Sequence, residues 1–223
     1  MNALSWSACQ PPCLPSTRGQ YVDVDPLNVA KDAADLFGAV GGPGNDDLWR
    51  FIPLGPFDSA DQLIGVMSGL AQGLGWRTHV LRKPSDGTVL GMASYMHLRP
   101  EVGAAEVGCI VFSKALQQTP AATEAMFIMA RHLFEDLGYR RYEWRCDDRN
   151  AASKRAAERI GFTFEGLARQ DVVVRDENRD TASYSLLDRE WPPAKAAFES
   201  WLSAENFDDA GNQRQSLAAF QSV

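Results

Sequence analysis

One short stretch, from Glu106 to Thr123, constrains the fold of this chain more than any other. It reads EVGCIVFSKALQQTPAAT: an apolar run of strand type ends in a polar loop, and a proline follows. Thr119 is suited to cap a helix, and Pro120 suits the first helical position, where an amide would be unpaired anyway. A strand, loop and helix in this order direct N–H groups and a positive helix end to one point, which suits a phosphate or pyrophosphate. An ordinary capped helix start explains the same spacing.

The spacing of apolar residues along the chain predicts a mixed α+β fold. The expected helices cover residues 29–40, 59–72, 120–137, 151–160 and 194–204; the expected strands cover 21–24, 76–81, 89–98, 103–112, 139–146, one or two strands within 162–174, and 181–187. The three strands between 76 and 112 form an antiparallel meander. The strand at 139–146 follows a crossover helix, which favours parallel pairing.

A single domain over residues 19–204 fits the size of the chain. Its 223 residues are 45% hydrophobic, which suffices for one sizeable core. Residues 1–18 hold several prolines without apolar periodicity, and we interpret them as a flexible leader. The polar residues 205–223 are expected to form a frayed tail.

The charge pattern argues against one class of partner and leaves another open. The net charge is −7, and Lys and Arg are spread along the chain instead of forming the basic stripe of a nucleic-acid-binding protein. We therefore expect no nucleic-acid partner. An acidic surface attracts a cationic substrate such as an amine, although it also simply aids solubility.

Hydropathy and cysteine use predict a cytoplasmic protein with no membrane partner. No window approaches 18 consecutive apolar residues, and the N-terminus lacks the basic and apolar regions of a signal peptide. Four cysteines are too few for a disulfide framework in a chain of this length. Cys9 and Cys13 lack a second Cys/His pair at metal-ligand spacing, so we expect no metal site.

Four motifs in the second half of the chain follow one another in a family-specific order. Residues 106–108 read EVG, residues 117–125 read QQTPAATEA, residues 150–153 read NAAS, and Gly161-Phe162 comes eight residues after Ser153. With these motifs the region 91–190 resembles the GCN5-related N-acetyltransferase (GNAT) superfamily. Within it, the chain resembles the branch that includes the ribosomal-protein alanine N-acetyltransferases. The resemblance implies a mostly antiparallel central sheet, with a parallel pair splayed around the acyl-CoA site and helices on both sides.

The same resemblance implies acetyl-CoA as co-substrate and no metal. The expected contacts come from the end of one strand, the loop and two helix starts: Ile110, Phe112, Gln117, Gln118, Thr119, Ala121, Ala122, Thr123, Asn150 and Ser153. Pro120 departs from the family pattern, which has glycine there. Because proline has no N–H, one pyrophosphate contact is lost or reassigned, while the stiffer loop loses less entropy on binding. Lys154 and Arg155 are candidates for the 3′-phosphate, or they form a solvated helix face.

Two residues are candidates for catalysis. Aminolysis of a thioester needs a neutral amine, so Glu106 is a chemically apt general base, directly or through water. The resemblance implies that Ser153 protonates the leaving thiolate, since the tyrosine that many relatives use is replaced here by Ala157. Ordinary structural roles remain open for both, as a strand-end carboxylate and as a polar residue at a helix start.

The acceptor pocket is expected from the first ninety residues and the last hairpin. The candidates for its wall, each of which also suits the core or the surface, are Trp49, Phe51, Trp76, Tyr95 and Arg169. His97 ends a strand near the acceptor side and is a further candidate, while His79 and His132 suggest neither a metal nor a triad.

These observations predict an acyl-CoA-dependent N-acetyltransferase. It would move an acetyl group to a primary amine, either a small molecule or a protein N-terminus, by direct attack, since no nucleophile motif such as G-x-S-x-G occurs. The alternative is a CoA-binding or regulatory module that has lost turnover, with Pro120 as the sign of drift. Both a monomer and a homodimer are compatible with the sequence.

Overall fold

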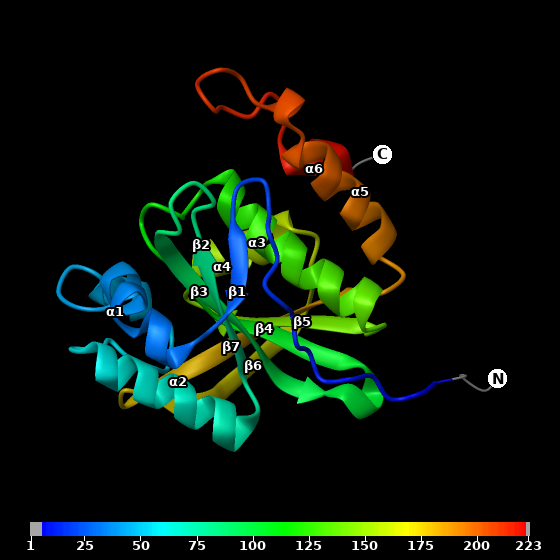
Figure 1. Ribbon diagram of the computed structural model, residues 1–223. Helices are drawn as coiled ribbons and strands as arrows, with labels where there is room; N and C mark the ends of the chain where they lie inside the picture. Colours follow the sequence, from blue (N-terminus) through cyan, green and yellow to red (C-terminus); the bar gives the residue numbers. More distant parts are fainter. Residues whose placement is uncertain (1–5, 222–223) are drawn as a thin grey trace.

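Seven strands form one sheet that organises the molecule, in the computed structural model that describes residues 6–221. The order across the sheet is β1-β2-β3-β4-β5-β7-β6 (Figure 1). The strands are β1 (Asp23–Pro26), β2 (Arg77–Arg82), β3 (Val89–Arg99), β4 (Ala104–Phe112), β5 (Arg141–Asp147), β6 (Thr163–Val174) and β7 (Glu177–Leu187). Neighbouring strands are antiparallel except β4 and β5, which are parallel. This architecture confirms the expected fold class.

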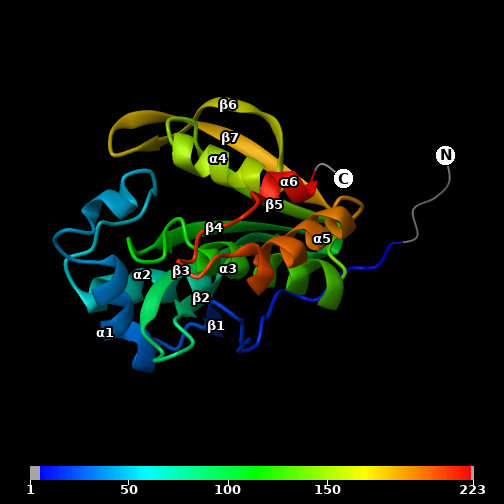
Figure 2. The ribbon, with the colours of Figure 1, turned by 90° about the horizontal axis from the view of Figure 1, so that it is seen from above.

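Helices cover both faces of this sheet (Figures 1 and 2). They are α1 (Val29–Val40), α2 (Ala60–Leu74), α3 (Pro120–Arg131), α4 (Ala151–Arg159), α5 (Trp191–Leu202) and α6 (Leu217–Gln221). α1 and α2 pack on one face around a core cluster that includes Trp49, Leu63 and Met67. On the other face, α3, α4 and α5 share a larger core with β5, which includes Met129 and Tyr142.

Side-chain caps fix the starts of the first two helices. Asn28 Oδ1 accepts from the Lys31 amide at 3.1 Å at the start of α1. Ser59 Oγ accepts from the Gln62 amide at 3.2 Å at the start of α2. Each cap satisfies one of the amides that a helix start leaves without an internal partner.

Three element boundaries differ from the sequence-based expectation by three residues or more. β7 begins at Glu177, because Arg175 and Asp176 both take positive φ angles and make a two-residue hairpin turn. α5 begins at Trp191, and the two prolines that follow lie in its first turn, where proline is tolerated. α3 ends at Arg131 and continues as a π-helical turn over His132–Asp136, so the regular helix is shorter than predicted.

Particular residues of the expected leader and tail make buried contacts or hydrogen bonds with the domain. Leu14 is only 3% exposed, and the Cys9 amide donates to the Pro100 carbonyl at 2.9 Å. At the other end, Leu217 is fully buried and Trp201 Nε1 donates to Gln213 Oε1 at 2.8 Å. Apolar burial therefore orders segments whose prolines and polar residues suggested mobility. The remaining parts of these two predictions, residues 1–5 and 222–223, lie outside the described residues.

Within residues 6–221, no helix combines the length and the apolar character needed to cross a bilayer.

Candidate active site

A cleft of about 1210 Å³ opens where β4 and β5 part. The two strands pair from Ala104–Arg141 to Glu106–Glu143 and then diverge, which gives the splayed pair that the sequence predicts. Nearly all of the predicted site residues line this cleft: Glu106, Ile110, Phe112, Gln117, Gln118, Thr119, Ala122, Thr123, Asn150 and Ser153. The exception is Ala121, which packs against the core instead.

A bulge in β4 helps to separate the two strands. Between the pairs Ser94–Gly108 and Met92–Val111, two residues of β4 lie opposite one residue of β3, and Cys109 takes a φ of +46°. Such a bulge leaves backbone groups unpaired and bends the strand. Burial raises the pKa of the Cys109 thiol to about 12, so this thiol stays protonated at neutral pH and is not an activated nucleophile.

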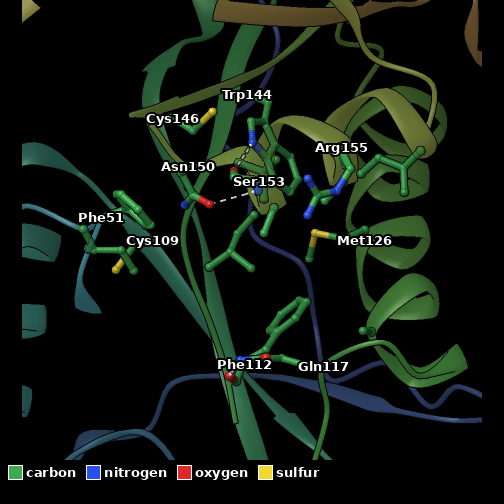
Figure 3. Close-up of a pocket in the computed structure, with 18 of the residues that line it drawn as sticks. Phe51, Cys109, Phe112, Gln117, Met126, Trp144, Cys146, Asn150, Ser153 and Arg155 are labelled. Carbon is green, nitrogen blue, oxygen red and sulfur yellow. Dashed lines mark hydrogen bonds between the residues drawn. The ribbon is translucent and has the colours of Figure 1, made fainter. Parts of the chain in front are cut away.

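The loop between β4 and α3 is held by its own side chains. Gln117 Nε2 donates to the Phe112 carbonyl at 2.9 Å, so the loop folds back on the end of β4. Thr119 Oγ1 donates to the Leu116 carbonyl at 2.6 Å and accepts from the Ala122 amide at 3.3 Å, which makes it the predicted N-cap. These bonds fix the N-terminal end of α3 at the border of the cleft. Figure 3 shows Gln117 and Phe112 side by side in the lower part of the view.

Ser153 lies at the start of α4 with its hydroxyl facing β5 (Figure 3). Its backbone amide donates to Asn150 Oδ1 at 3.0 Å, so Asn150 caps α4. Trp144 Nε1 donates to Ser153 Oγ at 2.9 Å. Because the hydroxyl oxygen accepts from the indole, its proton points elsewhere and can be donated.

Glu106 lies on β4 at the point where the parallel pairing ends. The residue is 3% exposed, and its Oε2 lies 2.7 Å from His97 Nδ1. The hydrogen bond to Glu106 is the main cause of a raised pKa for His97. The structure thus brings together a carboxylate that the sequence identified as a candidate base and a histidine that it placed only near the acceptor side.

Arg159 is a site residue that the sequence reasoning missed. Its Nη1 donates to Thr123 Oγ1 at 3.0 Å, and its guanidinium lies 4.8 Å from the ring centroid of Trp201. Arg155, one helical turn earlier on α4, also lines the cleft, and this i, i+4 spacing was the available signal. Lys154 instead forms an ion pair with Asp148 at 2.7 Å, so it is engaged on the surface.

Two of the five residues expected as candidates for the acceptor wall line the cleft. Phe51 and Trp76 line the cleft, whereas Trp49 and Tyr95 are fully buried in the two cores. Arg169 lines a separate hollow beside Asp148. Trp49 and Tyr95 thus take the core role that the sequence left open for them. Which aromatic side chains reach the cleft depends on packing that a sequence does not show.

Arg175 holds the loop 49–55 beside the cleft in a way that the sequence did not predict. It lies in the turn between β6 and β7 and donates to backbone carbonyls of the loop 49–55. Its acceptors are the carbonyl oxygens of Trp49, Arg50, Ile52, Leu54 and Gly55, at 2.8–3.3 Å. One guanidinium therefore ties the last hairpin to a loop that lines the cleft.

Within residues 6–221, no group of three or more His, Cys, Asp or Glu side chains is placed to hold a metal ion.

Comparison with known proteins agrees with this geometry. Residues 24–163 match the family model described as the acetyltransferase (GNAT) domain. This chain belongs to the GNAT family. It is similar to a GCN5-related N-acetyltransferase from Brucella melitensis, at 36% identity and a TM-score of 0.92, over 98% of this chain and 99% of that structure. A probable GNAT acetyltransferase from Chromobacterium violaceum ATCC 12472 is 40% identical, with a TM-score of 0.79, over 86% of this chain and 96% of that one.

A curated relative from Bacillus subtilis (strain 168) carries the name "Putative ribosomal N-acetyltransferase YdaF". It is 34% identical over 110 residues, which are 49% of this chain. The matched region spans 60% of the length of that relative. This GNAT chain therefore shares about half of its length with that protein.

Proposed function

We propose that this GNAT chain transfers an acetyl group from acetyl-CoA to a primary amine by direct attack. One observation carries the proposal: a single cleft is lined by the capped start of α3, by Glu106 and by Ser153. The helix start suits a pyrophosphate, and Glu106 together with Ser153 suits proton transfer during aminolysis. The donor acetyl-CoA supplies the thioester that the amine attacks.

The residues that would hold the CoA moiety fit its chemistry. The start of α3 borders the cleft with Thr119 engaged as its cap, and Arg155 and Arg159 add positive charge along α4. Pro120 contributes no N–H, so the neighbouring amides of Gln118 and Thr119 have to carry that part of the contact. The strand edge that β4 exposes after Glu106 suits the amide groups of the pantetheine arm.

The site residues divide the proton transfers between them. Glu106 supplies the carboxylate of the base side of the site, where the amine proton is removed directly or through a group bound to it. Ser153, whose oxygen accepts from Trp144, offers its hydroxyl proton to the departing thiolate in competition with the neighbouring Cys146 sulfur. The thiols of Cys109 and Cys146 both have raised pKa values because of burial, which favours direct attack over an acyl-enzyme.

The acceptor is an amine that reaches the cleft beside the loop 49–55. Both classes expected from the sequence, a small-molecule amine and a protein N-terminus, place a nitrogen near Glu106, and the ribosomal name of the Bacillus relative favours the second. We also propose a cytoplasmic location and a monomer or homodimer. The four cysteines are free in the structure, as suits a reducing compartment.

The test is thiol release from acetyl-CoA with a panel of amines and short peptides. The proposal predicts acceptor-dependent release that falls by about 10²-fold in Glu106→Gln, the order expected when general-base catalysis is impaired. Calorimetry on the same samples reports CoA binding independently. CoA binding without turnover on any acceptor would favour the drifted binding module, and no CoA binding would contradict both functions.

A further inference from the structure

His97 projects into the cleft because β3 is irregular there. The pairs Met96–Glu106 and Arg99–Ala104 leave two residues of β3 opposite one residue of β4. His97 takes a φ of +47°, a conformation that a residue with a Cβ adopts at an energetic cost. Such a bulge re-aims a side chain, and strained backbone gathers at functional sites. Here it turns the imidazole toward Glu106 instead of along the strand.

The two partners of this contact differ greatly in accessibility. The Glu106 side chain is 4% exposed, whereas the His97 side chain is 51% exposed and lines the cleft. A carbon added at Gly108 would lie 3.2 Å from Glu106 Oε1, so the carboxylate is also closely packed on that side. An incoming amine therefore meets the imidazole more readily than the carboxylate.

The contact also determines which imidazole nitrogen is available. Glu106 Oε2 is 2.7 Å from Nδ1, and an ionised carboxylate only accepts, so Nδ1 carries the proton. In the neutral ring, Nε2 is then the unprotonated atom. A carboxylate that orients an imidazole in this way also stabilises the imidazolium ion that forms when Nε2 takes up a proton.

We propose that His97 Nε2 takes the proton from the acceptor amine, and that Glu106 is the positioning residue that orients the ring. This inference rests on the proposed acetyl transfer. The C–N bond forms and the C–S bond breaks, so the sulfur leaves with the bonding electron pair. The amine proton passes to Nε2, the thiolate is protonated by Ser153 or water, and His97 returns its proton to solvent.

The surrounding charges indicate how this step depends on pH. The hydrogen bond to Glu106 raises the pKa of His97, Glu143 acts in the same direction, and burial and Arg145 oppose it. Glu143 itself is paired with Arg99 and Arg141, which moderates its influence. His97 must be neutral to accept a proton, so activity rises as the pH increases through its pKa.

The test is the pH profile of kcat/KM for wild type, His97→Gln and Glu106→Gln, because this profile reports groups of the free enzyme. Wild type should lose activity on acidification through a group with a pKa above 6.5, and imidazole NMR should assign that titration to His97. His97→Gln should lower kcat by about 10²-fold and abolish the acidic limb of the pH profile, the fall in activity at low pH. Glu106→Gln should keep residual activity and move the limb to lower pH, since the carboxylate no longer raises the pKa.

A matched control is available elsewhere in the chain. His132 and Asp136 form an imidazole–carboxylate pair of the same 2.7 Å length, and neither residue lines the cleft. Asp136→Asn should leave the profile unchanged. CoA affinity and thermal unfolding of each variant would show that the effects do not come from misfolding.

Two outcomes would overturn the inference, and they are distinguishable. In the first, wild type turns over, and folded His97→Gln keeps full activity and the same acidic limb of the pH profile. This result would exclude His97 as the base while leaving acetyl transfer intact. Absence of wild-type turnover on every acceptor would overturn both proposals.

Discussion

The hydroxyl of Ser153 is prepared for donation by its neighbour Trp144. The indole N–H already occupies an acceptor position on the oxygen at 2.9 Å, which turns the hydroxyl proton toward other partners. The cap by Asn150 acts on the backbone amide of Ser153 and leaves the side chain free. A serine that looks like an ordinary helix-start residue in the sequence thus has the geometry of a proton donor.

Replacing Ser153 by alanine should therefore lower kcat while CoA affinity is retained. A general acid contributes about 10²–10⁴-fold, and a thiolate leaves readily, so we expect a loss of about tenfold, below that range. Steady-state kinetics and calorimetric CoA binding would measure the two effects. An unchanged kcat would mean that water protonates the thiolate.

The residues predicted from the sequence were those whose roles follow from local order. Asn150, Thr119 and Ser153 lie at helix starts, where spacing alone indicates caps and exposed amides. The contact between His97 and Glu106 depends on a bulge, and bulges carry no signal in a single sequence. Arg175 acts through carbonyl groups 120–126 positions away, which only the folded chain brings together.

At the scale of elements, the start of α3 combines a structural cap with the proposed anion site. Thr119→Ala would remove the hydroxyl that holds the Ala122 amide and the Leu116 carbonyl. We expect unfolding free energy to fall by about 1 kcal/mol, as for other caps, and CoA affinity to fall with it. Urea unfolding and calorimetry would measure both.

The cap of α2 gives a matched control for this experiment. Ser59 holds the Gln62 amide in the same way and does not line the cleft. Ser59→Ala should cost similar stability without changing CoA affinity. Equal losses of CoA affinity in both variants would show that the start of α3 has no special role in binding.

The contact between the β6–β7 hairpin and the loop 49–55 should act on the acceptor alone. Arg175→Ala removes five hydrogen bonds to loop carbonyls and frees the loop that carries Phe51. We expect a KM for the acceptor raised about tenfold, faster proteolysis within 49–55, and unchanged CoA affinity; a factor of ten corresponds to about 1.4 kcal/mol. Arg189→Ala, an exposed arginine outside the cleft, is the control.

An unchanged acceptor KM together with faster cleavage would show that the loop is tied down without shaping the acceptor site.

The β6–β7 hairpin that carries Arg175 was only partly predicted from the sequence. The sequence placed the last strand at 181–187, but the turn consists only of Arg175 and Asp176, whose positive φ angles suit a tight hairpin, so the strand begins earlier.

At the scale of the whole molecule, the two ends of the chain complete the domain. Leu14 of the N-terminal segment packs into the core, and its carbonyl lies 3.3 Å from His79 Nε2. At the C-terminal end, Trp201, Phe207 and Gln213 line the cleft beside α4. Composition suggested mobility for both segments, because proline and polar content describe the segment alone and not the surface it meets.

The buried His79 should make folding sensitive to acid. Burial lowers its pKa to about 4, whereas the unfolded chain binds a proton near 6.5. The unfolded state therefore binds more protons between these values, so stability is full above 6.5 and falls as the pH drops toward 4. The loss is about 3 kcal/mol when the whole interval is crossed.

Urea unfolding of wild type and His79→Gln at pH 7 and pH 4.5 would isolate this contribution. The carboxylates titrate in both proteins, so the difference between them reports His79. We expect wild type to lose about 2 kcal/mol more than the variant on acidification. Equal losses would contradict the buried, neutral state of this histidine.

The central claim is that the cleft between β4 and β5 binds CoA with its pyrophosphate at the start of α3. A crystal structure of the chain with CoA tests it most directly. The account predicts pyrophosphate oxygens within hydrogen-bond distance of the amides in 118–123, and the sulfur between the splayed strands beside Ser153. CoA bound elsewhere, or a cleft that stays empty at saturating CoA, would contradict it.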